Sequence, residues 1–329
     1  MEYFNLKEFG ARTMKCCVDE DVINKLAKLN KLTRYKIVPF EDRHVNIFIF
    51  GLPRSGTTLL SQLLAKYTDL GYINNLTARF WVNPAFGVIL SKSLNLYQRD
   101  KILLASEHGV TDSIYNVHEF GYFWASLLGH KSSSSSLGEN GKVKINFNLL
   151  RNKVLSINNE FCSGCVFKNT LIGHYASKFN ELFKQPLFVY IKRDIIKVAT
   201  SVLAVRKERY GDFNHWWSTK PYEYEKIKNF EHYEQVVAQL FYLNRDIEQQ
   251  LQLLPRNRIL TVNYEELCEA PDVFLKHLKE KVEQYDMSLN CRCILEVLES
   301  QSKVSSLGGR DFKILEGLIK KYFGVVNDV

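Results

Sequence analysis

The sequence of 329 residues predicts an α/β fold in which one parallel sheet is covered by helices on both faces. Three observations support this prediction. Short runs of β-branched and aromatic residues recur at 45–50, 187–191 and 259–262. Longer stretches with helical periodicity separate these runs. A glycine-bounded loop at 51–58 joins the first run to a helical stretch. Strands that alternate with helices form parallel sheets, because each helix returns the chain to the edge where the next strand begins.

The individual elements are expected in a regular order. Pro186 precedes a run that is apolar on both faces, which is typical of a buried parallel strand. Pro255 ends a long helix whose apolar positions recur three and four apart. The expected strands lie at 45–50, 166–168, 187–191 and 259–262, and the expected helices at 57–66, 147–161, 171–184, 195–207, 231–254, 272–301 and 311–323.

We expect a single domain over residues 1–329, built on a P-loop-type sheet with helical insertions. Residues 1–43 are expected to form a helical cover before the first strand. Residues 72–147 are expected to hold an aromatic-rich helical insert and a flexible loop, because 131–142 contains five consecutive serines and two glycines. Residues 272–329 are expected to add C-terminal helices.

The composition excludes several classes of protein. Hydrophobic residues make up 46% of the chain, which is too many for a disordered protein. The net charge is +8, but the Lys and Arg residues form no basic run, so we expect no nucleic-acid partner. A pocket for a ligand with several negative charges would account for part of this positive charge. The N-terminus lacks the apolar core of a signal peptide, and no apolar run approaches the length of a membrane span. These features predict a cytoplasmic protein without a transmembrane segment.

The seven cysteines suggest free thiols in a reducing compartment. Cys162 and Cys165 have the spacing of a redox or metal motif, which is the alternative interpretation. Cys291 and Cys293 have the wrong spacing to complete a four-cysteine zinc site. We therefore expect no bound metal.

Residues 51–58 read Gly-Leu-Pro-Arg-Ser-Gly-Thr-Thr and separate a strand from a helix. Backbone N–H groups converge at a helix N-terminus, where the helix dipole favours an anion, so this loop is predicted to bind a nucleotide phosphate. A loop that hydrolyses nucleoside triphosphates carries a lysine before its final Ser or Thr, but here Thr57 occupies that position. The cation in this loop is instead Arg54, after Pro53. The alternative is a glycine-rich turn without a ligand.

A second anion site is predicted where the run at 187–191 ends. Arg193 and Asp194 follow this run, and Ser201 lies about two helical turns further along. An arginine at the carboxyl end of a strand points into the ligand crevice of an open α/β sheet. A guanidinium binds phosphate through two parallel hydrogen bonds, which a serine hydroxyl can supplement. The alternative is a structural ion pair between Arg193 and Asp194.

With these two motifs, the chain resembles the sulfotransferases that use 3′-phosphoadenosine 5′-phosphosulfate (PAPS). The resemblance covers residues 44–268 in segments. The 51–58 loop is similar to the 5′-phosphosulfate loop of bacterial and tyrosylprotein sulfotransferases, and Arg193 and Ser201 match the family's 3′-phosphate pair. Residues 262–265 (Val-Asn-Tyr-Glu) and 306–310 (Ser-Leu-Gly-Gly-Arg) resemble two weaker family segments. The resemblance implies that PAPS is bound by Pro53, Arg54, Ser55, Gly56, Thr57, Thr58, Arg193, Ser201, Tyr264 and Arg310.

The resemblance also implies transfer of a sulfuryl group to a hydroxyl, which needs a general base and cations near the leaving phosphate. Arg54 is one expected cation, and Lys168 resembles the family's second catalytic lysine. Cytosolic members carry a histidine base two residues after that lysine, where this chain has Thr170. The expected bases are therefore His118 and Glu119. On a helix, neighbours point about 100° apart, so one of the two is expected to face the sulfur. A packed histidine and a surface glutamate are the alternative.

Other interpretations remain open at this stage. His174 and His215 are weaker candidates for the base. A P-loop kinase for a small molecule would need Mg²⁺, for which Asp194 is the available acid. A nucleotide-binding scaffold without catalysis is the third possibility. Aromatic residues at 120–124 and 210–224 predict an apolar or planar face for the acceptor, but they do not indicate its class.

Overall fold

The computed structural model describes residues 40–107, 109–130, 136–138, 145–294 and 308–324. Its sheet has five strands in the order β2-β3-β1-β4-β5, and every pairing is parallel. The strands are β1 (Asn46–Gly51), β2 (Gly71–Tyr72), β3 (Cys165–Lys168), β4 (Pro186–Lys192) and β5 (Ile259–Asn263). The predicted α/β class is confirmed.

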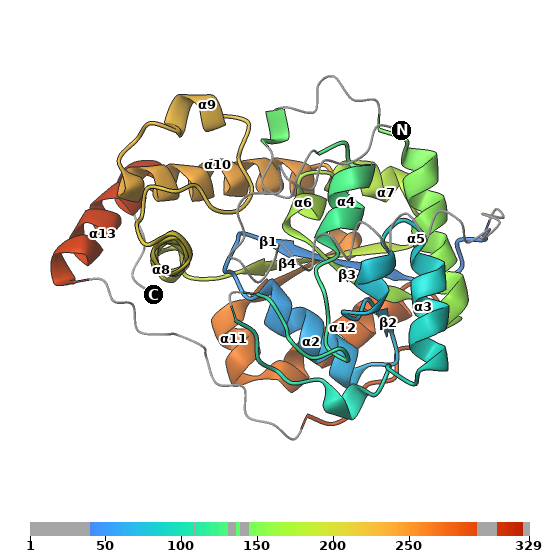
Figure 1. The fold of residues 1–329 in the computed structure, drawn as a ribbon. Helices are drawn as coiled ribbons and strands as arrows, with labels where there is room; N and C mark the ends of the chain where they lie inside the picture. Colours follow the sequence, from blue (N-terminus) through green and yellow to red (C-terminus); the bar gives the residue numbers. More distant parts are fainter. Residues whose placement is uncertain (1–39, 108, 131–135, 139–144, 295–307, 325–329) are drawn as a thin grey trace.

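The sheet separates two hydrophobic layers (Figure 1). Successive side chains of a strand point to opposite faces. Ile47 and Ile49 of β1 therefore pack with the helices drawn below the sheet, α2 (Thr57–Tyr67) and α12 (Pro271–Glu283). Phe48 and Phe50 pack in the other layer, which is covered by α4 (Gly121–Leu127), α6 (Thr170–Gly173), α7 (Ala176–Leu182) and α10 (His232–Gln252). All four of these β1 side chains are fully buried.

The remaining helices follow the chain in order and match most of the predicted positions. Within the described residues, the 3₁₀ turns η2 (Thr77–Phe80), η3 (Arg99–Lys101) and η5 (Arg256–Arg258) lie between larger elements. The other helices are α3 (Pro84–Ser93), α5 (Phe147–Phe161), α8 (Ile195–Tyr210), α9 (Tyr224–Ile227), α11 (Tyr264–Glu269) and α13 (Gly309–Phe323).

Two local predictions are wrong, and one strand was not predicted. The helix expected at 171–184 is divided into α6 and α7, because His174 turns toward α10 and bonds Asp246. The helix expected at 272–301 ends at Glu283, and residues 284–294 contain no helix. Strand β2 was not anticipated, because two residues are too few to show an alternating pattern. Most of the expected N-terminal cover and of the serine-rich loop lies outside the described residues.

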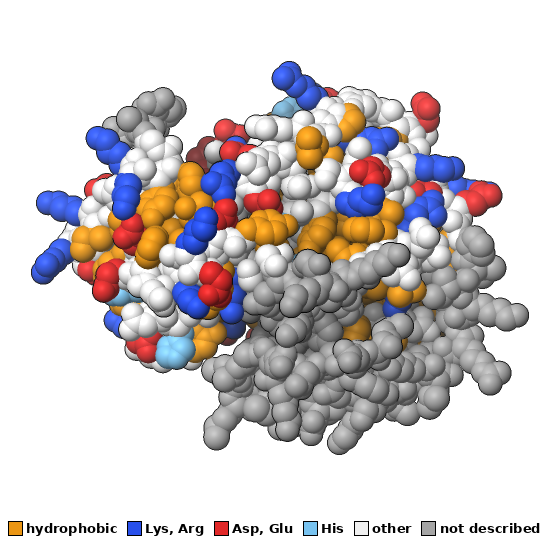
Figure 2. All heavy atoms as spheres, turned by 90° about the horizontal axis from the view of Figure 1, so that it is seen from above, with side chains coloured by type: hydrophobic (Ala, Val, Ile, Leu, Met, Phe, Trp, Pro, Cys, Tyr) orange, Lys and Arg blue, Asp and Glu red, His pale blue; other side chains and the backbone are white. Residues whose placement is uncertain are grey.

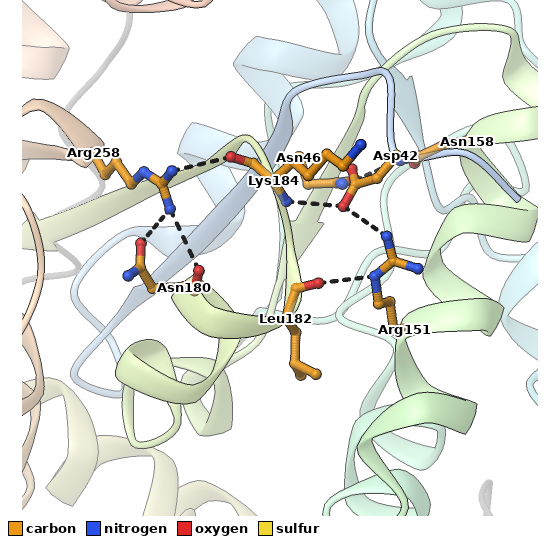
Figure 3. A network of polar contacts seen from close by, with 8 residues as sticks. All are labelled: Asp42, Asn46, Arg151, Asn158, Asn180, Leu182, Lys184 and Arg258. Carbon is orange, nitrogen blue, oxygen red and sulfur yellow. Dashed lines mark hydrogen bonds and ion pairs between the residues drawn. The ribbon is translucent and has the colours of Figure 1, made fainter.

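The buried carboxylate of Asp42 attaches the segment before β1 to the side of the sheet where the strands begin (Figure 3). The Asp42 side chain is fully buried, accepts a hydrogen bond from the Lys184 backbone N–H (2.9 Å) and pairs with Arg151 (3.4 Å). Arg151 also donates to the Leu182 carbonyl, and Arg258 donates to the Lys184 carbonyl (3.0 Å). These bonds join the start of β1 to α5 and to the turn before β4.

Replacing Asp42 with alanine is expected to lower the free energy of unfolding by about 1–3 kcal/mol, because the Lys184 N–H and Arg151 both lose the buried carboxylate that accepts from them. Urea denaturation monitored by circular dichroism measures this change. Glu41→Ala is the matched control, since Glu41 pairs with Arg43 on the exposed surface, and it should not alter the transition measurably. Equal midpoints for the two variants would contradict the proposed role of Asp42.

No helix in the described part of the chain is both long enough and apolar enough to cross a membrane.

Candidate active site

The 51–58 loop leaves the carboxyl end of β1 and turns sharply, with the Ser55 N–H bonded back to the Leu52 carbonyl (3.1 Å). Arg54 and Gly56 both have left-handed backbone angles, with φ of 70° and 101°. Residues of this kind within a loop form an anion-binding concavity. A Cβ atom on Gly56 would lie 2.2 Å from the Tyr264 ring, so this position requires glycine for both its φ and its packing. Helix α2 begins at the next residue, Thr57.

The loop side chains are largely buried against the sheet. Pro53, Thr57 and Thr58 are buried, and Ser55 is 1% exposed. Among the described residues, the Ser55 hydroxyl has no hydrogen-bond partner. A buried hydroxyl at the start of a helix is available to an anion that the backbone N–H groups bind.

Arg54 and the predicted second anion site come together. The Arg54 Nε donates to the Ser201 hydroxyl of α8 (2.9 Å), and the Arg193 guanidinium donates to the Arg54 carbonyl (3.1 Å). Arg193 also lies 4.3 Å from the centroid of the Tyr264 ring, at the start of α11. The ends of β1, β4 and β5 thus bring four predicted residues to one place. Asp194 accepts a hydrogen bond from the Ile196 N–H and caps α8. It therefore does not form the structural ion pair with Arg193 that was the alternative interpretation.

The electrostatics of this cluster favour an anionic ligand. The pKa of Arg54 is lowered to about 10, first by burial and then by the positive charges of Arg193 and Arg209. Arg54 therefore remains cationic at neutral pH, in a partly desolvated position beside other guanidinium groups. A bound polyanion would reduce this mutual repulsion, which is the physical reason to expect one here.

A second group of polar residues lies at the end of the neighbouring strand β3. The Lys168 ammonium is 3.1 Å from the Glu119 carboxylate, and Lys168 is paired in register with Ile49 of β1. The Lys168 side chain is 5% exposed and that of Glu119 is 41% exposed. The chain before Glu119 also approaches the loop, since a Cβ on Gly109 would lie 4.0 Å from an Arg54 nitrogen. Lys168 pairs in register with Ile49, two residues before the loop begins, so the Lys168–Glu119 pair lies at the carboxyl end of the strand next to β1.

His118 and Glu119 are not on a helix, contrary to the sequence prediction. Helix α4 begins at Gly121, and Phe120 before it has a left-handed φ of 56°, which is uncommon for a residue with a Cβ. The Phe120 N–H donates to the His118 Nδ1 (2.8 Å). This bond requires an unprotonated Nδ1, so the neutral ring carries its proton on Nε2. Such a ring can donate from Nε2 but cannot accept a proton there, whereas Glu119 can accept one.

Comparison with known proteins identifies the family. The sequence model of the Sulfotransferase family matches residues 46–283. The chain belongs to the sulfotransferase family. The matched region contains β1, the 51–58 loop and both groups of polar residues described above. The expected family resemblance is thus confirmed.

Solved structures agree at the level of the fold. The structure is similar to sulfotransferase STF9 from Mycobacterium avium, with a TM-score of 0.54 and 10% identity over 80% of this chain and 71% of that chain. It is also similar to sulfotransferase STF1 from Mycobacterium tuberculosis H37Rv, with a TM-score of 0.52 and 12% identity over 91% of this chain and 81% of that chain. No curated protein matches the sequence. At these identities, the similarity supports the sulfotransferase fold.

Arg209 was missed by the sequence analysis, although it acts on the arginine cluster of this sulfotransferase. It lies near the end of α8, about two helical turns beyond Ser201, and its charge contributes to the lowered pKa of Arg54. Its guanidinium lies 5.9 Å from the centroid of the Trp217 ring. The sequence did hold a signal for Arg209, because extending the helical spacing from Ser201 by about two turns reaches it.

Arg310 is not brought to the arginine cluster by any described contact. It is exposed at the start of α13, where its charge acts on Tyr233 of α10. Residues 306 and 307 of the proposed closing loop lie outside the described residues. The assignment of Arg310 to the nucleotide therefore stays a prediction.

The weaker histidine candidates have other partners. The His174 Nδ1 bonds Asp246 at 2.5 Å, and His215 bonds Asp212 at 3.1 Å in an exposed turn. Cys165 is buried while Cys162 is exposed, and the described residues contain no cluster of three or more acidic, histidine or cysteine side chains able to hold a metal.

The aromatic segments divide between core and surface. Phe123 and Trp124 are fully buried, so most of the 120–124 segment fills the core instead of facing an acceptor. In the 210–224 segment, Tyr222 is 51% exposed and Trp217 is partly buried. On the face seen from above, hydrophobic side chains lie between Lys and Arg side chains (Figure 2). A separate cavity of about 280 Å³, lined by Asp69 and Arg99 among others, contains none of the predicted site residues.

Proposed function

We propose that this sulfotransferase transfers the sulfuryl group of PAPS to a hydroxyl acceptor by in-line displacement. The observation that carries the proposal is the meeting of Arg54, Arg193 and Ser201 at a left-handed loop, beside the Lys168–Glu119 pair. The first group suits a nucleotide with phosphates at both ends of its ribose. The second group suits removal of a proton from a hydroxyl.

The donor would lie along the carboxyl edge of the sheet. Backbone N–H groups of the 51–58 loop and the Ser55, Thr57 and Thr58 hydroxyls would bind the 5′-phosphosulfate. Arg193 and Ser201 would bind the 3′-phosphate through charge-assisted hydrogen bonds. Tyr264 supports Arg193 through its ring face. This assignment explains why the site needs more than one guanidinium.

The chemical step requires little beyond these side chains. The acceptor oxygen attacks sulfur and forms a new S–O bond, while Glu119 takes the hydroxyl proton. The bond between sulfur and the 5′-phosphate oxygen breaks, and its electron pair stays on the leaving adenosine 3′,5′-bisphosphate. Arg54 and Lys168 stabilise the negative charge that develops on that phosphate. The Lys168 ammonium lies 3.1 Å from the Glu119 carboxylate, so the proposed cation and the proposed base are in direct contact.

Calorimetry tests the donor assignment. In buffer containing EDTA, adenosine 3′,5′-bisphosphate is expected to bind at least about ten-fold more tightly than ATP, because ATP lacks the 3′-phosphate. Turnover of PAPS should also persist in EDTA, since the loop pairs an arginine with backbone N–H groups and has no lysine for a magnesium nucleotide. Tighter binding of ATP that depends on Mg²⁺ would favour the kinase alternative. Nucleotide binding without any turnover would favour a scaffold.

A further inference from the structure

We infer that Asn169 is a positioning residue that holds Glu119 against Lys168 and beside the 51–58 loop. The inference rests on the proposed role of Glu119 as the base. Asn169 does not reach the reacting atoms in this account. It acts through the backbone of Glu119, which it contacts from the end of β3.

Asn169 links three segments that meet at the site. Its backbone N–H donates to the Ile49 carbonyl of β1 (3.1 Å), two residues before the loop begins at Gly51. Its side-chain Oδ1 accepts from the Leu171 N–H (2.9 Å) and caps α6. Its Nδ2 donates to the Glu119 carbonyl (3.1 Å). Asn169 is 3% exposed, so solvent competes little for these bonds.

The segment that carries Glu119 needs such a contact. Glu119 precedes Phe120, whose left-handed backbone conformation is held by the bond from its N–H to His118. A non-glycine residue in this conformation persists only when its surroundings fix it. The His118 N–H donates to the Ile73 carbonyl (2.8 Å), and the Asn169 side-chain amide donates to the carbonyl of the next residue, Glu119. The turn is therefore held by the residues that directly follow β2 and β3.

The amide of asparagine suits this position because it accepts and donates at once. A serine at the start of α6 would still accept from the Leu171 N–H, since serine and asparagine are comparable N-caps. Its shorter side chain would not reach the Glu119 carbonyl. Asn169→Ser therefore separates the helix-capping role from the contact with Glu119. Asn146→Ser is the control for helix capping, because the Asn146 side chain caps α5 by accepting from the Leu149 N–H and no contact among the described residues joins it to the site. Asn146 is exposed, whereas Asn169 is buried.

The first experiment compares turnover, nucleotide affinity and stability. Release of adenosine 3′,5′-bisphosphate from PAPS is measured with phenol as acceptor probe, and with water alone. Asn169→Ser is expected to lower turnover by about ten-fold or more, because small misplacement of a reacting group is costly. Calorimetric affinity for the bisphosphate should match that of Asn146→Ser, whereas the melting temperature should be lower, because the Glu119 carbonyl loses its donor. Turnover equal to that of Asn146→Ser would overturn the inference.

A double-mutant cycle distinguishes positioning from general damage. If Asn169 acts through Glu119, Asn169→Ser should cause no further loss in a Glu119→Gln background. The same fold loss in both backgrounds would mean that Asn169 does not act through Glu119. The pH–rate profile gives a second check, because a displaced Glu119 should move the acidic limb in Asn169→Ser and not in Asn146→Ser.

A measurement without turnover keeps this inference separate from the proposed function. The ammonium signal of Lys168 in a ¹⁵N spectrum, assigned by its absence in Lys168→Met, reports the hydrogen bond to Glu119. It should be protected from exchange in the wild type and in Asn146→Ser, and lost in Asn169→Ser. Retention of the signal in Asn169→Ser would overturn the inference. Failure of the wild type to bind the bisphosphate would instead overturn the proposed function.

Discussion

Replacing Glu119 with glutamine is expected to lower turnover of PAPS by about 10²–10⁴-fold, the range typical of a lost general base. Glutamine has nearly the same shape and still accepts a hydrogen bond from Lys168, but it cannot take a proton from the acceptor. Affinity for adenosine 3′,5′-bisphosphate should therefore change little. Single-turnover kinetics and calorimetry on the same preparation measure the two quantities.

Two variants make this expectation specific. Glu225→Gln removes a carboxylate that pairs with Lys228 on the exposed surface, and it should leave turnover unchanged. His118→Ala is expected to cost less than Glu119→Gln, because His118 bonds the Phe120 N–H through Nδ1. If Glu119→Gln turns over normally and His118→Ala does not, the base is His118. If both variants retain full turnover, the base lies elsewhere.

Replacing Arg193 with alanine is expected to weaken adenosine 3′,5′-bisphosphate by about ten- to a hundred-fold. This range follows from a charge-assisted bond worth about 1.5–3 kcal/mol, at 1.4 kcal/mol for each factor of ten. Adenosine 5′-phosphate has no 3′-phosphate, so its affinity should barely change. Calorimetric titration of both ligands gives the contrast, and a partly unfolded variant would weaken both.

Lys192 provides the control for charge. It directly precedes Arg193 at the end of β4, but it is exposed and pairs with Glu248 (3.3 Å) on the surface. Lys192→Ala should leave both affinities within about two-fold, because screened surface charges contribute little. Equal losses of the two nucleotides in Arg193→Ala would mean that Arg193 supports the loop through the Arg54 carbonyl and does not select the 3′-phosphate.

Much of the fold was predictable because its signals are local. The runs that became β1, β4 and β5 are apolar and bounded by glycine or proline, and helix α5 spans the predicted residues 147–161. The α6–α7 break was not predictable, because it depends on the bond between His174 and Asp246, 72 residues further along the chain. Periodicity within a window does not register a contact of that range.

The candidate site also combines residues with local sequence signals and residues that only distant contacts identify. The sequence indicated Arg54 and Arg193 from their positions after strands and Ser201 from its spacing along the following helix, and the structure brings these three together. It left His118 and Glu119 undecided, because the helix assumed for them is a turn before α4. Only the hydrogen bond from the Phe120 N–H to His118 separates the two by chemistry. Asn169 and Arg209 matter through contacts with distant residues, which a motif does not show.

The sequence by itself determined the fold class, the glycine-bounded loop at 51–58 and the family, because strands, helices and glycine-bounded turns follow from residues close together in the chain. The tertiary structure alone decided which side chains share the site. Arg54 and Ser201 are 147 residues apart, and Lys168 and Glu119 are 49 apart. Their meeting depends on the strand order β3-β1-β4 and on its register. That order follows from packing both faces of the sheet at once, which involves residues from the whole chain.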